Sequence, residues 1–221
     1  MDFRGRIRQE AAARGIQCAV HFTQLTNLPG IVANGLLSRV ELIADRSDGV
    51  VSATNRLDGE ISAVSVSVSA MNWAMFQSKR SANSGAAWVV LFLDPSIFWT
   101  KPCRFLSLNA AKSSMRNHRG RLDGPWAFSE MFSNEARPTG FEGPDYRKAT
   151  QIPDYLTTRP EAEVQVFSQI PPSAILEAWV ETEDIGRQVD DELAKIGDGR
   201  DRTVNVRPFA PCFSNDFSHW G

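Results

Sequence analysis

Two glutamates precede a short apolar segment in the sequence PEAEVQV, at residues 160–166. Alternate residues of a strand share a face, so Glu161 and Glu163 are expected to point one way and the apolar side chains the other. Two like charges on a solvated strand edge need have no function. A carboxylate at the mouth of a site, by contrast, stabilises developing positive charge or accepts a proton, and a second carboxylate beside it can raise its pKa.

Two other polar features lie at the ends of expected elements. His21 comes near the end of the strand-like segment CAVHFT (18–23), and three serines alternate with valines over residues 64–69. A single histidine is most often structural, and a hydroxyl-lined strand face is often simply exposed. An early histidine, a hydroxyl-rich middle strand and a late glutamate are nevertheless the order of parts in an ADP-ribosyltransferase, where the carboxylate stabilises the oxocarbenium-like state formed as nicotinamide leaves.

Other common site chemistries lack their residues in this sequence. The histidines His21, His118 and His219 have no histidine partner four residues away and no HExxH frame, so no metal is expected. The hydrolase motif GxSxG is absent, and so is the glycine-rich fingerprint of nucleotide-binding folds. Glu161 and Glu163 lie on one strand, whereas a retaining glycosidase needs carboxylates on opposite sides of its sugar.

Length and composition are those of an ordinary globular protein. The chain has 221 residues, 42% of them hydrophobic, and a net charge of −2, which argues against a generic polyanion binder. No apolar run approaches the ~18 residues of a membrane helix, and the charged N-terminus lacks the apolar core of a signal peptide. Three widely spaced cysteines fit neither a disulfide framework nor a zinc site, so a cytoplasmic location without membrane attachment is expected.

Hydrophobic periodicity predicts helices and strands without a regular βαβα alternation. The expected helices cover residues 2–15, 28–34, 71–80, 124–132 and 182–196. The expected strands cover residues 18–23, 64–69, 86–93 and 162–167, with one more inside 170–180. Segment 39–60 is expected to be a loop with a short helical turn, segment 133–157 is expected to be a long loop, and the tail after Gly197 is expected to be irregular. The prediction is one α+β domain over residues 1–221, with a core at about 18–180 and a C-terminal extension of unknown role.

A basic segment at residues 101–122 stands out from the nearly neutral chain. Its positively charged residues are Lys101, Arg104, Lys112, Arg116, Arg119 and Arg121, with His118 among them and no acid before Asp123. Such a segment is either a solvated face or the footprint of a phosphate backbone.

An ordered series of short segments resembles the DarT family of DNA ADP-ribosyltransferase toxins. The series is HFTQLTNLPGIVANGLLS (21–38), RLDG (56–59), SVSVSAMNWAMF (65–76), WVVLFLDPSIFW (88–99), LNAA (108–111) and EAEVQVF (161–167). The similarity covers roughly residues 18–180. The RLDG, NAA and PxAEV segments are closer to the guanine-modifying branch of the family than to the thymine-modifying branch.

The resemblance implies a split β-sheet of the ADP-ribosyltransferase type and transfer of ADP-ribose from NAD onto a base, here guanine, of single-stranded DNA. Glu163 is then the catalytic glutamate, and it also serves as a general base for the acceptor nitrogen. Arg56 binds the NAD phosphates and assists the reaction; otherwise it forms an ion pair with Asp58. The further NAD contacts implied are His21, Phe22, Thr23, Gly35, Leu36, Ser67 and Met75.

The resemblance also implies a partner for the basic segment. Its side chains are expected to follow a single-strand backbone, while Trp126 or Phe128 offers a stacking face. Loop 133–157 corresponds to the acceptor-recognising loop, in which Tyr146 or Tyr155 either stacks on a base or anchors the loop. The nucleic-acid contacts implied are Lys112, Arg116, Arg119, Arg121, Tyr155 and Glu161; a merely solvated Glu161 is the alternative.

Some features depart from the family or stay open. Ala70 replaces a proline that usually precedes the helix at Asn72, so altered packing around an intact pocket is expected. Asn109 either shapes the pocket or caps a helix, and residues after 185 match poorly.

The expected partner is a cognate antitoxin, an ADP-ribosyl-removing macrodomain or similar hydrolase. The alternatives are an NAD-dependent transferase acting on RNA or protein, and a non-catalytic module that binds nucleic acid or NAD.

Overall fold

The computed structural model describes residues 2–44, 59–118 and 120–212, which contain one sheet of seven strands in the order β4-β5-β2-β1-β3-β6-β7. The strands are β1 (Ala19–Gln24), β2 (Val64–Val68), β3 (Trp88–Leu93), β4 (Cys103–Leu106), β5 (Glu163–Val166), β6 (Ile175–Val180) and β7 (Thr203–Val206). The α-helices are α1 (Phe3–Ala13), α2 (Leu28–Asn34), α3 (Arg39–Ala44), α4 (Trp73–Ala82), α5 (Ile97–Thr100), α6 (Ser113–Arg116), α7 (Pro125–Glu130), α8 (Tyr146–Ala149) and α9 (Glu183–Ala194). Short 3-10 turns are η1 (Leu25–Asn27), η2 (Asn134–Ala136) and η3 (Pro172–Ala174).

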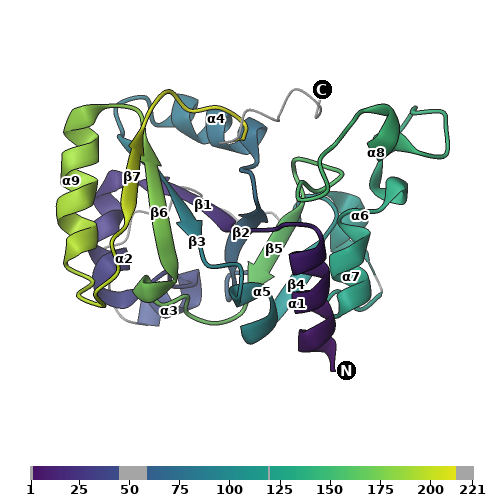
Figure 1. Ribbon diagram of the computed structural model, residues 1–221, viewed down its shortest axis with the longest axis horizontal. Coiled ribbons are helices and arrows are strands. Elements are labelled where there is room, and N and C mark those ends of the chain that lie inside the picture. The colour runs from purple at the N-terminus through teal and green to yellow at the C-terminus, as the bar shows by residue number, and fades with distance from the viewer. Residues whose placement is uncertain (1, 45–58, 119, 213–221) are drawn as a thin grey trace.

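The sheet consists of two halves that meet over a very short stretch. Strands β1 and β2 pair only at Ala19 with Val68 and at Val20 with Ser67, whereas β1 pairs with β3 along its whole length. Beyond Val20 the two strands therefore separate. One half is β4-β5-β2 and the other is β1-β3-β6-β7, as Figure 1 shows. This is the split β-sheet that the sequence resemblance implies.

Side-chain alternation explains why the inner strands are buried. In β2 the three valines are buried and the serines between them are half-exposed, as the period-two pattern predicts. All six residues of β3 are buried, because Val89, Leu91 and Leu93 join one hydrophobic cluster and Trp88, Val90 and Phe92 join another. Burial on both faces is typical of a central strand covered by helices.

Helices cover the two halves of the sheet separately. Helices α1, α5 and α7 pack with one another beside β4, and α2 and α9 pack beside β6 and β7 (Figure 1). Phe76 of α4 lies in the second hydrophobic cluster with Trp179 of β6. Both sheet halves therefore have a helical support, which fixes the strands at their meeting point.

Two strands were not predicted from the sequence. Strand β4 lies inside the basic segment and has an exposed Arg104 in its middle, and β7 lies in the tail that was expected to be irregular. Four residues are too few for a periodic signal to be distinct. Strand β7 runs parallel to β6 after the crossover through α9, and Phe209 beyond it joins the second cluster, so the tail is part of the fold. Strand β5 begins at Glu163, one residue later than expected.

Gly35 ends α2 in a conformation that only glycine tolerates. Its φ is +78°, and a Cβ at this position would lie 2.3 Å from the carbonyl oxygen of Ile170. Leu36 and Ile170 exchange backbone hydrogen bonds there, so neither segment can move away cheaply. We expect Gly35→Ala to lower the free energy of unfolding by about 3 kcal/mol.

Urea unfolding of Gly35→Ala beside Gly30→Ala checks this expectation. Gly30 lies inside α2, and a Cβ there would meet no atom within 4 Å. Gly30→Ala should therefore leave stability unchanged or raise it by up to about 1 kcal/mol. Equal stability of the two variants would contradict the close approach at Gly35.

Candidate active site

Glu163, the first residue of β5, has donors from two other segments on its carboxylate. Ser65 Oγ of β2 donates to Oε1 at 2.6 Å, and the backbone N–H of Ala110 donates to Oε2 at 3.1 Å. A carboxylate that accepts at both oxygens is held in one orientation. Val66 pairs with Val164, so the half-buried Glu163 lies close to the residues that join the two halves of the sheet.

His21 of β1 is held by the same serine. Its Nδ1 donates to the Ser65 carbonyl at 3.0 Å, and because a carbonyl only accepts, Nδ1 carries the hydrogen. Burial lowers the pKa of His21 below its ordinary 6.5, although the hydrogen bond to Ser65 opposes this shift. The ring is therefore neutral at pH 7, with Nε2 as an acceptor. Such a ring suits a hydroxyl donor like that of a ribose.

Ser65 connects the two side chains, although the sequence did not single it out. Its carbonyl holds His21 and its hydroxyl holds Glu163, which are 44 and 98 residues away in the chain. The expected NAD contact, Ser67, lies two residues along β2 on the same face and pairs with Val20. The serine ladder was the right signal, but its period does not tell which serine faces β5.

A tight turn supplies the backbone donor to Glu163. Asn109 Oδ1 accepts from the N–H of Ala111 at 2.9 Å, and the Asn109 carbonyl accepts from the N–H of Lys112 at 3.0 Å. Asn109 thus caps a turn and not a helix, because the N-cap of the following helix α6 is Lys112. The turn directs the Ala110 N–H toward Glu163, so Asn109 also positions a donor of the site.

Glu161 is engaged by cations rather than directed with Glu163. Arg159 Nη2 lies 2.5 Å and Lys112 Nζ 2.7 Å from its Oε1, and it precedes β5 in a turn. Burial of the carboxyl acts to raise its pKa, but the hydrogen bonds from Arg159 and Lys112 outweigh this and lower the pKa of Glu161 to about 2. The expectation that Glu161 shares a strand face with Glu163 is therefore wrong. The pKa of Glu161 is lowered, whereas the pair of carboxylates was expected to raise the pKa of one member. Lys112 belongs to the same turn as Ala110, so this turn contacts Glu161 through a side chain and Glu163 through a backbone N–H.

The ion pairs of Glu161 predict an acid-dependent loss of stability. A carboxyl whose pKa falls from 4.5 to about 2 on folding stabilises the protein above pH 4.5 and loses that contribution as the pH falls towards 2. Because Lys112 is partly exposed, we expect a contribution of about 1–3 kcal/mol. Urea unfolding of the protein and of Glu161→Gln should give a difference of this size at pH 7 that shrinks as the pH falls towards 2. A difference independent of pH would contradict the assignment.

A cavity of about 480 Å³ opens beside the Glu163 carboxylate. Its border is shared with the carboxylate, because Leu106 pairs with Glu163 across β4 and β5 and Ala110 bonds Oε2. The lining residues are Glu60, Arg104, Leu106, Ala110, Met115, Arg116, His118, Gly120, Arg121, Leu122, Asp123 and Gln165. Two predicted DNA contacts, Arg116 and Arg121, thus meet at this cavity.

Arg104 and Gln165 line the cavity, although neither was among the site residues predicted from the sequence. Arg104 pairs with Glu60 at 3.3 Å, and its guanidinium lies 4.9 Å from the ring centroid of Phe167. Gln165, 2% exposed, lies opposite Arg104 across β4 and β5. Arg104 belonged to the basic segment, but only a strand at this position shows that it faces the cavity.

The remaining predicted NAD contacts lie near the ends of β1 and α2 and in the first turn of α4. Buried Thr23 accepts from Asn27 Nδ2 at 3.0 Å, and the Phe22 ring packs 5.0 Å from Phe76. Met75, 36% exposed, lies in the first turn of α4, where its N–H is capped by Asn72 at 3.1 Å. Gly35 and Leu36 form the bridge to Ile170. Arg56 and Arg119 lie outside the described residues.

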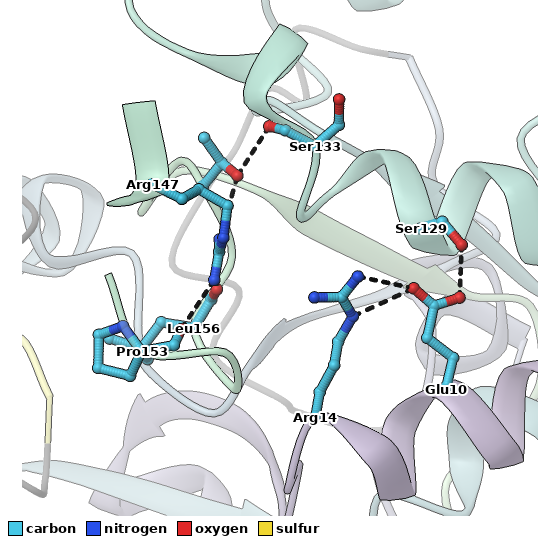
Figure 2. Close-up of polar contacts among 8 residues, drawn as sticks. Glu10, Arg14, Ser129, Ser133, Arg147, Pro153 and Leu156 are labelled. Carbon is cyan, nitrogen blue, oxygen red and sulfur yellow. Dashed lines mark hydrogen bonds and ion pairs between the residues drawn. The ribbon is translucent and has the colours of Figure 1, made fainter. Parts of the chain in front are cut away.

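The predicted loop 133–157 is tied into a compact unit that contains η2 and α8. Figure 2 shows Arg147 directed toward Pro153 and Leu156, whose carbonyls accept from it at 2.8 and 2.9 Å. Thr158 accepts from the same guanidinium at 3.1 Å and donates to the Ser133 carbonyl. Desolvation by burial lowers the pKa of Arg147, as expected for a guanidinium bonded mainly to neutral carbonyls.

The aromatic residues near this loop divide into anchors and exposed rings. Tyr146 is buried against Phe141 with ring centroids 4.9 Å apart, so it anchors the loop. Tyr155 is half-buried against the core. Phe128 is fully buried, so the expectation that it offers a stacking face is wrong. Trp126 remains 41% exposed.

The described residues contain neither a membrane-spanning helix nor a group of metal-binding side chains. None of the helices in this part of the chain is long and apolar enough to cross a membrane. Within the same residues, no three His, Cys, Asp or Glu side chains are grouped as a metal ion would require.

Solved structures of DarT proteins share this fold. Thermus sp. 2.9 DarT in complex with carba-NAD+ superposes with a TM-score of 0.56 at 17% identity, covering 86% of this chain and 95% of that one. The same protein in complex with ADP-ribosylated ssDNA gives a TM-score of 0.54 at 16% identity, covering 87% and 95%. Thermosipho africanus DarTG in complex with ADP-ribose gives 0.53 at 13% identity, covering 86% of this chain and 50% of that one. These likenesses confirm the ADP-ribosyltransferase-like α+β fold.

Sequence comparison agrees with the fold. No curated protein matches the chain. The family model described as "DarT: ssDNA thymidine ADP-ribosyltransferase, DarT" matches residues 20–213, which is most of the chain. The chain therefore belongs to the DarT family of ssDNA ADP-ribosyltransferases.

Proposed function

We propose that this chain transfers ADP-ribose from NAD onto a base of single-stranded DNA and releases nicotinamide. The observation that carries the proposal is the contact of Glu163 and His21 with one serine at the split of the sheet. Ser65 of β2 holds the carboxylate of Glu163 on β5 and the neutral imidazole of His21 on β1, the two strands on either side of β2, in fixed orientations. Neighbours of the same fold in complex with NAD+ and with ADP-ribosylated ssDNA support this choice of substrates.

The chemistry needs one carboxylate in two roles. The bond between the ribose C1′ and the nicotinamide nitrogen breaks, nicotinamide keeps the electron pair, and positive charge develops on the ribose. Glu163, held by Ser65 and the Ala110 N–H, stabilises that charge. A base nitrogen then bonds C1′ and gives its proton to Glu163 as general base.

Binding of NAD is assigned to residues of the β1-β3 half and of the segment beyond α3. His21 Nε2 accepts from a ribose hydroxyl, and Arg56 pairs with the diphosphate because a guanidinium is always charged and forks towards two oxygens. Phe22, Thr23, Gly35, Leu36, Ser67 and Met75 complete the proposed NAD contacts.

The acceptor strand is assigned to the cavity beside Glu163. Arg116 and Arg121 line it and contact phosphates, and Lys112 lies next to it through the Ala110 turn. Arg119 and the half-buried Tyr155 extend this proposed surface. Glu161, whose pKa is low, acts by holding Lys112 in place.

Guanine is the proposed acceptor base, from the RLDG, NAA and PxAEV segments. The family description names thymidine, which is the second candidate. Incubation with NAD and single strands that contain one base type each, followed by mass spectrometry of nucleosides, decides between them. An ADP-ribose adduct on deoxyguanosine supports guanine, and an adduct on thymidine alone overturns it. No adduct on any strand overturns DNA as the acceptor.

The physiological role proposed is that of a cytoplasmic toxin whose modification is removed by an antitoxin. The DarTG neighbour bound to ADP-ribose supports a partner of that kind. Expression of the chain should stop growth, and co-expression of an ADP-ribosyl-removing macrodomain hydrolase should restore it. The runner-up, a transferase acting on RNA, is tested by offering RNA and DNA of one sequence in the same reaction.

A further inference from the structure

Two large aromatic side chains form an exposed pair, one member of which contacts Arg121, a residue that lines the cavity. Phe3 of α1 is 44% exposed and Trp126 of α7 is 41% exposed, and their rings meet edge to face with centroids 4.9 Å apart. Adjacent exposed apolar side chains are candidates for contact with a ligand. The pair is therefore a candidate extension of the site.

Trp126 is fixed in place and connected to the cavity through Arg121. Its indole N–H donates to the Arg121 carbonyl at 3.3 Å, and its ring lies against Gly124, where a Cβ would approach ring atoms to 2.2 Å. The Arg121 guanidinium lies 6.0 Å from the centroid of the Trp126 ring, and Arg121 lines the cavity. A cation and an aromatic ring thus continue from the cavity onto α7.

Helix α1 is anchored firmly enough to hold Phe3 beside Trp126. Ile7 and Ala11 are buried in the core, and Glu10 accepts hydrogen bonds from Ser129 of α7 and from Arg14 (Figure 2). The N-terminus of the helix is capped by Asp2, which accepts from the Gly5 N–H at 2.7 Å. Phe3 therefore belongs to a packed helix and not to a loose end.

The charge of α1 is not explained by helix stability. Its first residues contain Arg4, Arg6 and Arg8, and no acid lies between positions 3 and 9. Cations in a first helical turn are disfavoured by the positive end of the helix dipole, which favours anions. Arg6 follows Phe3 by three residues, so the two lie on the same flank of the helix. Exposed arginine beside exposed aromatic rings is instead the composition that binds single-stranded nucleic acid.

We propose that Phe3, Arg6 and Trp126 form a subsite for nucleotides that flank the modified base. Bases stack on the two rings while Arg6 and Arg121 contact the phosphates between them and the cavity. Helix α1 lies outside residues 20–213 that match the family model, so the subsite is contributed in part by a segment that the family model does not include. The inference rests on the proposed action on single-stranded DNA.

The test compares the full chain with variants in binding to labelled random-sequence single strands of about 15 and about 5 nucleotides. Phe3→Leu keeps apolar bulk but removes the ring, and it should weaken binding of the longer strand about 5- to 10-fold, whereas Phe3→Tyr restores it. Arg6→Gln should weaken binding about 3-fold and lower the salt-dependence slope by about 1. Arg187→Gln on the distant helix α9 is the matched control for a lost charge.

The short strand separates the subsite from the cavity. The short strand can occupy the cavity but is too short to extend to the subsite. Phe3→Leu and Arg6→Gln should therefore bind it with the same affinity as the unaltered chain. With NAD, both variants should raise KM for the longer strand while kcat stays the same, because only ground-state binding is lost.

Two results overturn the inference. One is unchanged binding of the longer strand by Phe3→Leu and Arg6→Gln, the result expected if this face instead docks a protein. The other is an equal loss of affinity for the longer strand in Phe3→Leu and Phe3→Tyr, which would show that the aromatic ring does not contribute to binding. If the unaltered chain still forms an ADP-ribose adduct on DNA, either result overturns the subsite alone and the proposed function stands. If the unaltered chain forms no DNA adduct, the proposed function itself is overturned.

Discussion

Glu163→Gln is expected to lower kcat for ADP-ribose transfer about 1,000-fold or more while the fold stays intact. Glutamine has the same shape and retains one acceptor oxygen, which can accept from the Ala110 N–H. The new amide can donate to Ser65 Oγ, because a hydroxyl both donates and accepts. The substitution therefore removes the negative charge and the proton acceptor while it preserves both contacts.

Nicotinamide release and DNA adduct formation, measured separately, check this prediction. Both should fall together, because the charge is needed for the cleavage of NAD and the base for the transfer. NAD affinity should change by less than about 3-fold, since the loss arises in the transition state. Glu177→Gln on β6, a strand carboxylate of the other sheet half, is the control. Transfer by Glu163→Gln within about 10-fold of the unaltered rate would contradict the assignment.

His21→Ala is expected to lower kcat/KM for NAD about 100-fold. The substitution removes the imidazole whose Nε2 accepts from a ribose hydroxyl, and it leaves the Ser65 carbonyl without its donor. The KM for the DNA strand should stay the same, because His21 is not among the residues that line the acceptor cavity. A larger effect on the DNA strand than on NAD would contradict the role given to His21.

The protonation of His21 is expected to make both the stability of the protein and the turnover of NAD fall at acid pH. Burial lowers its pKa in the folded state, so the unfolded ring takes up a proton first as the pH falls below 6.5. The contribution of the neutral ring to stability is therefore complete above pH 6.5 and is lost as the pH falls through the folded pKa. NAD turnover should be flat from pH 7 to 8 and decline at acid pH, since a protonated Nε2 cannot accept. A loss of turnover between pH 7 and 8 that tracks His21 would contradict the neutral tautomer.

Much of the secondary structure follows from local patterns. The valine and serine alternation of β2, the apolar run of β3 and the glycine at the end of α2 each carry their information within about ten residues, which is the range over which periodicity is read. Strands β4 and β7 are four residues long and lie at or near the edges of the sheet. Their strand conformation depends on pairing with a neighbouring strand, and their local sequence pattern is too short to predict it.

The site shows the same division between residue type and contact. A pair of glutamates late in the chain and a histidine on an early strand are visible as chemical types in the sequence, and the ordered family segments add their expected roles. Glu161 and Glu163 look equivalent in the sequence, yet one is held by Ser65 and Ala110 and the other by Arg159 and Lys112. The contacts in the folded protein decide the chemistry of each carboxylate. Hydrogen bonds and ion pairs change the pKa of a carboxyl group more than the residues beside it in the sequence do.

The sequence by itself determined the fold class, the absence of the familiar hydrolase and metal motifs, the family segments and the candidates Glu163 and His21. Only the tertiary structure decided that Ser65 links them, that Glu161 is neutralised by two cations, that Phe128 is core, and that Phe3 of a separate helix reaches Trp126. The physical reason is distance along the chain. The Ser65 contacts span 44 and 98 residues, and such pairings depend on strand order and register, which no local pattern encodes.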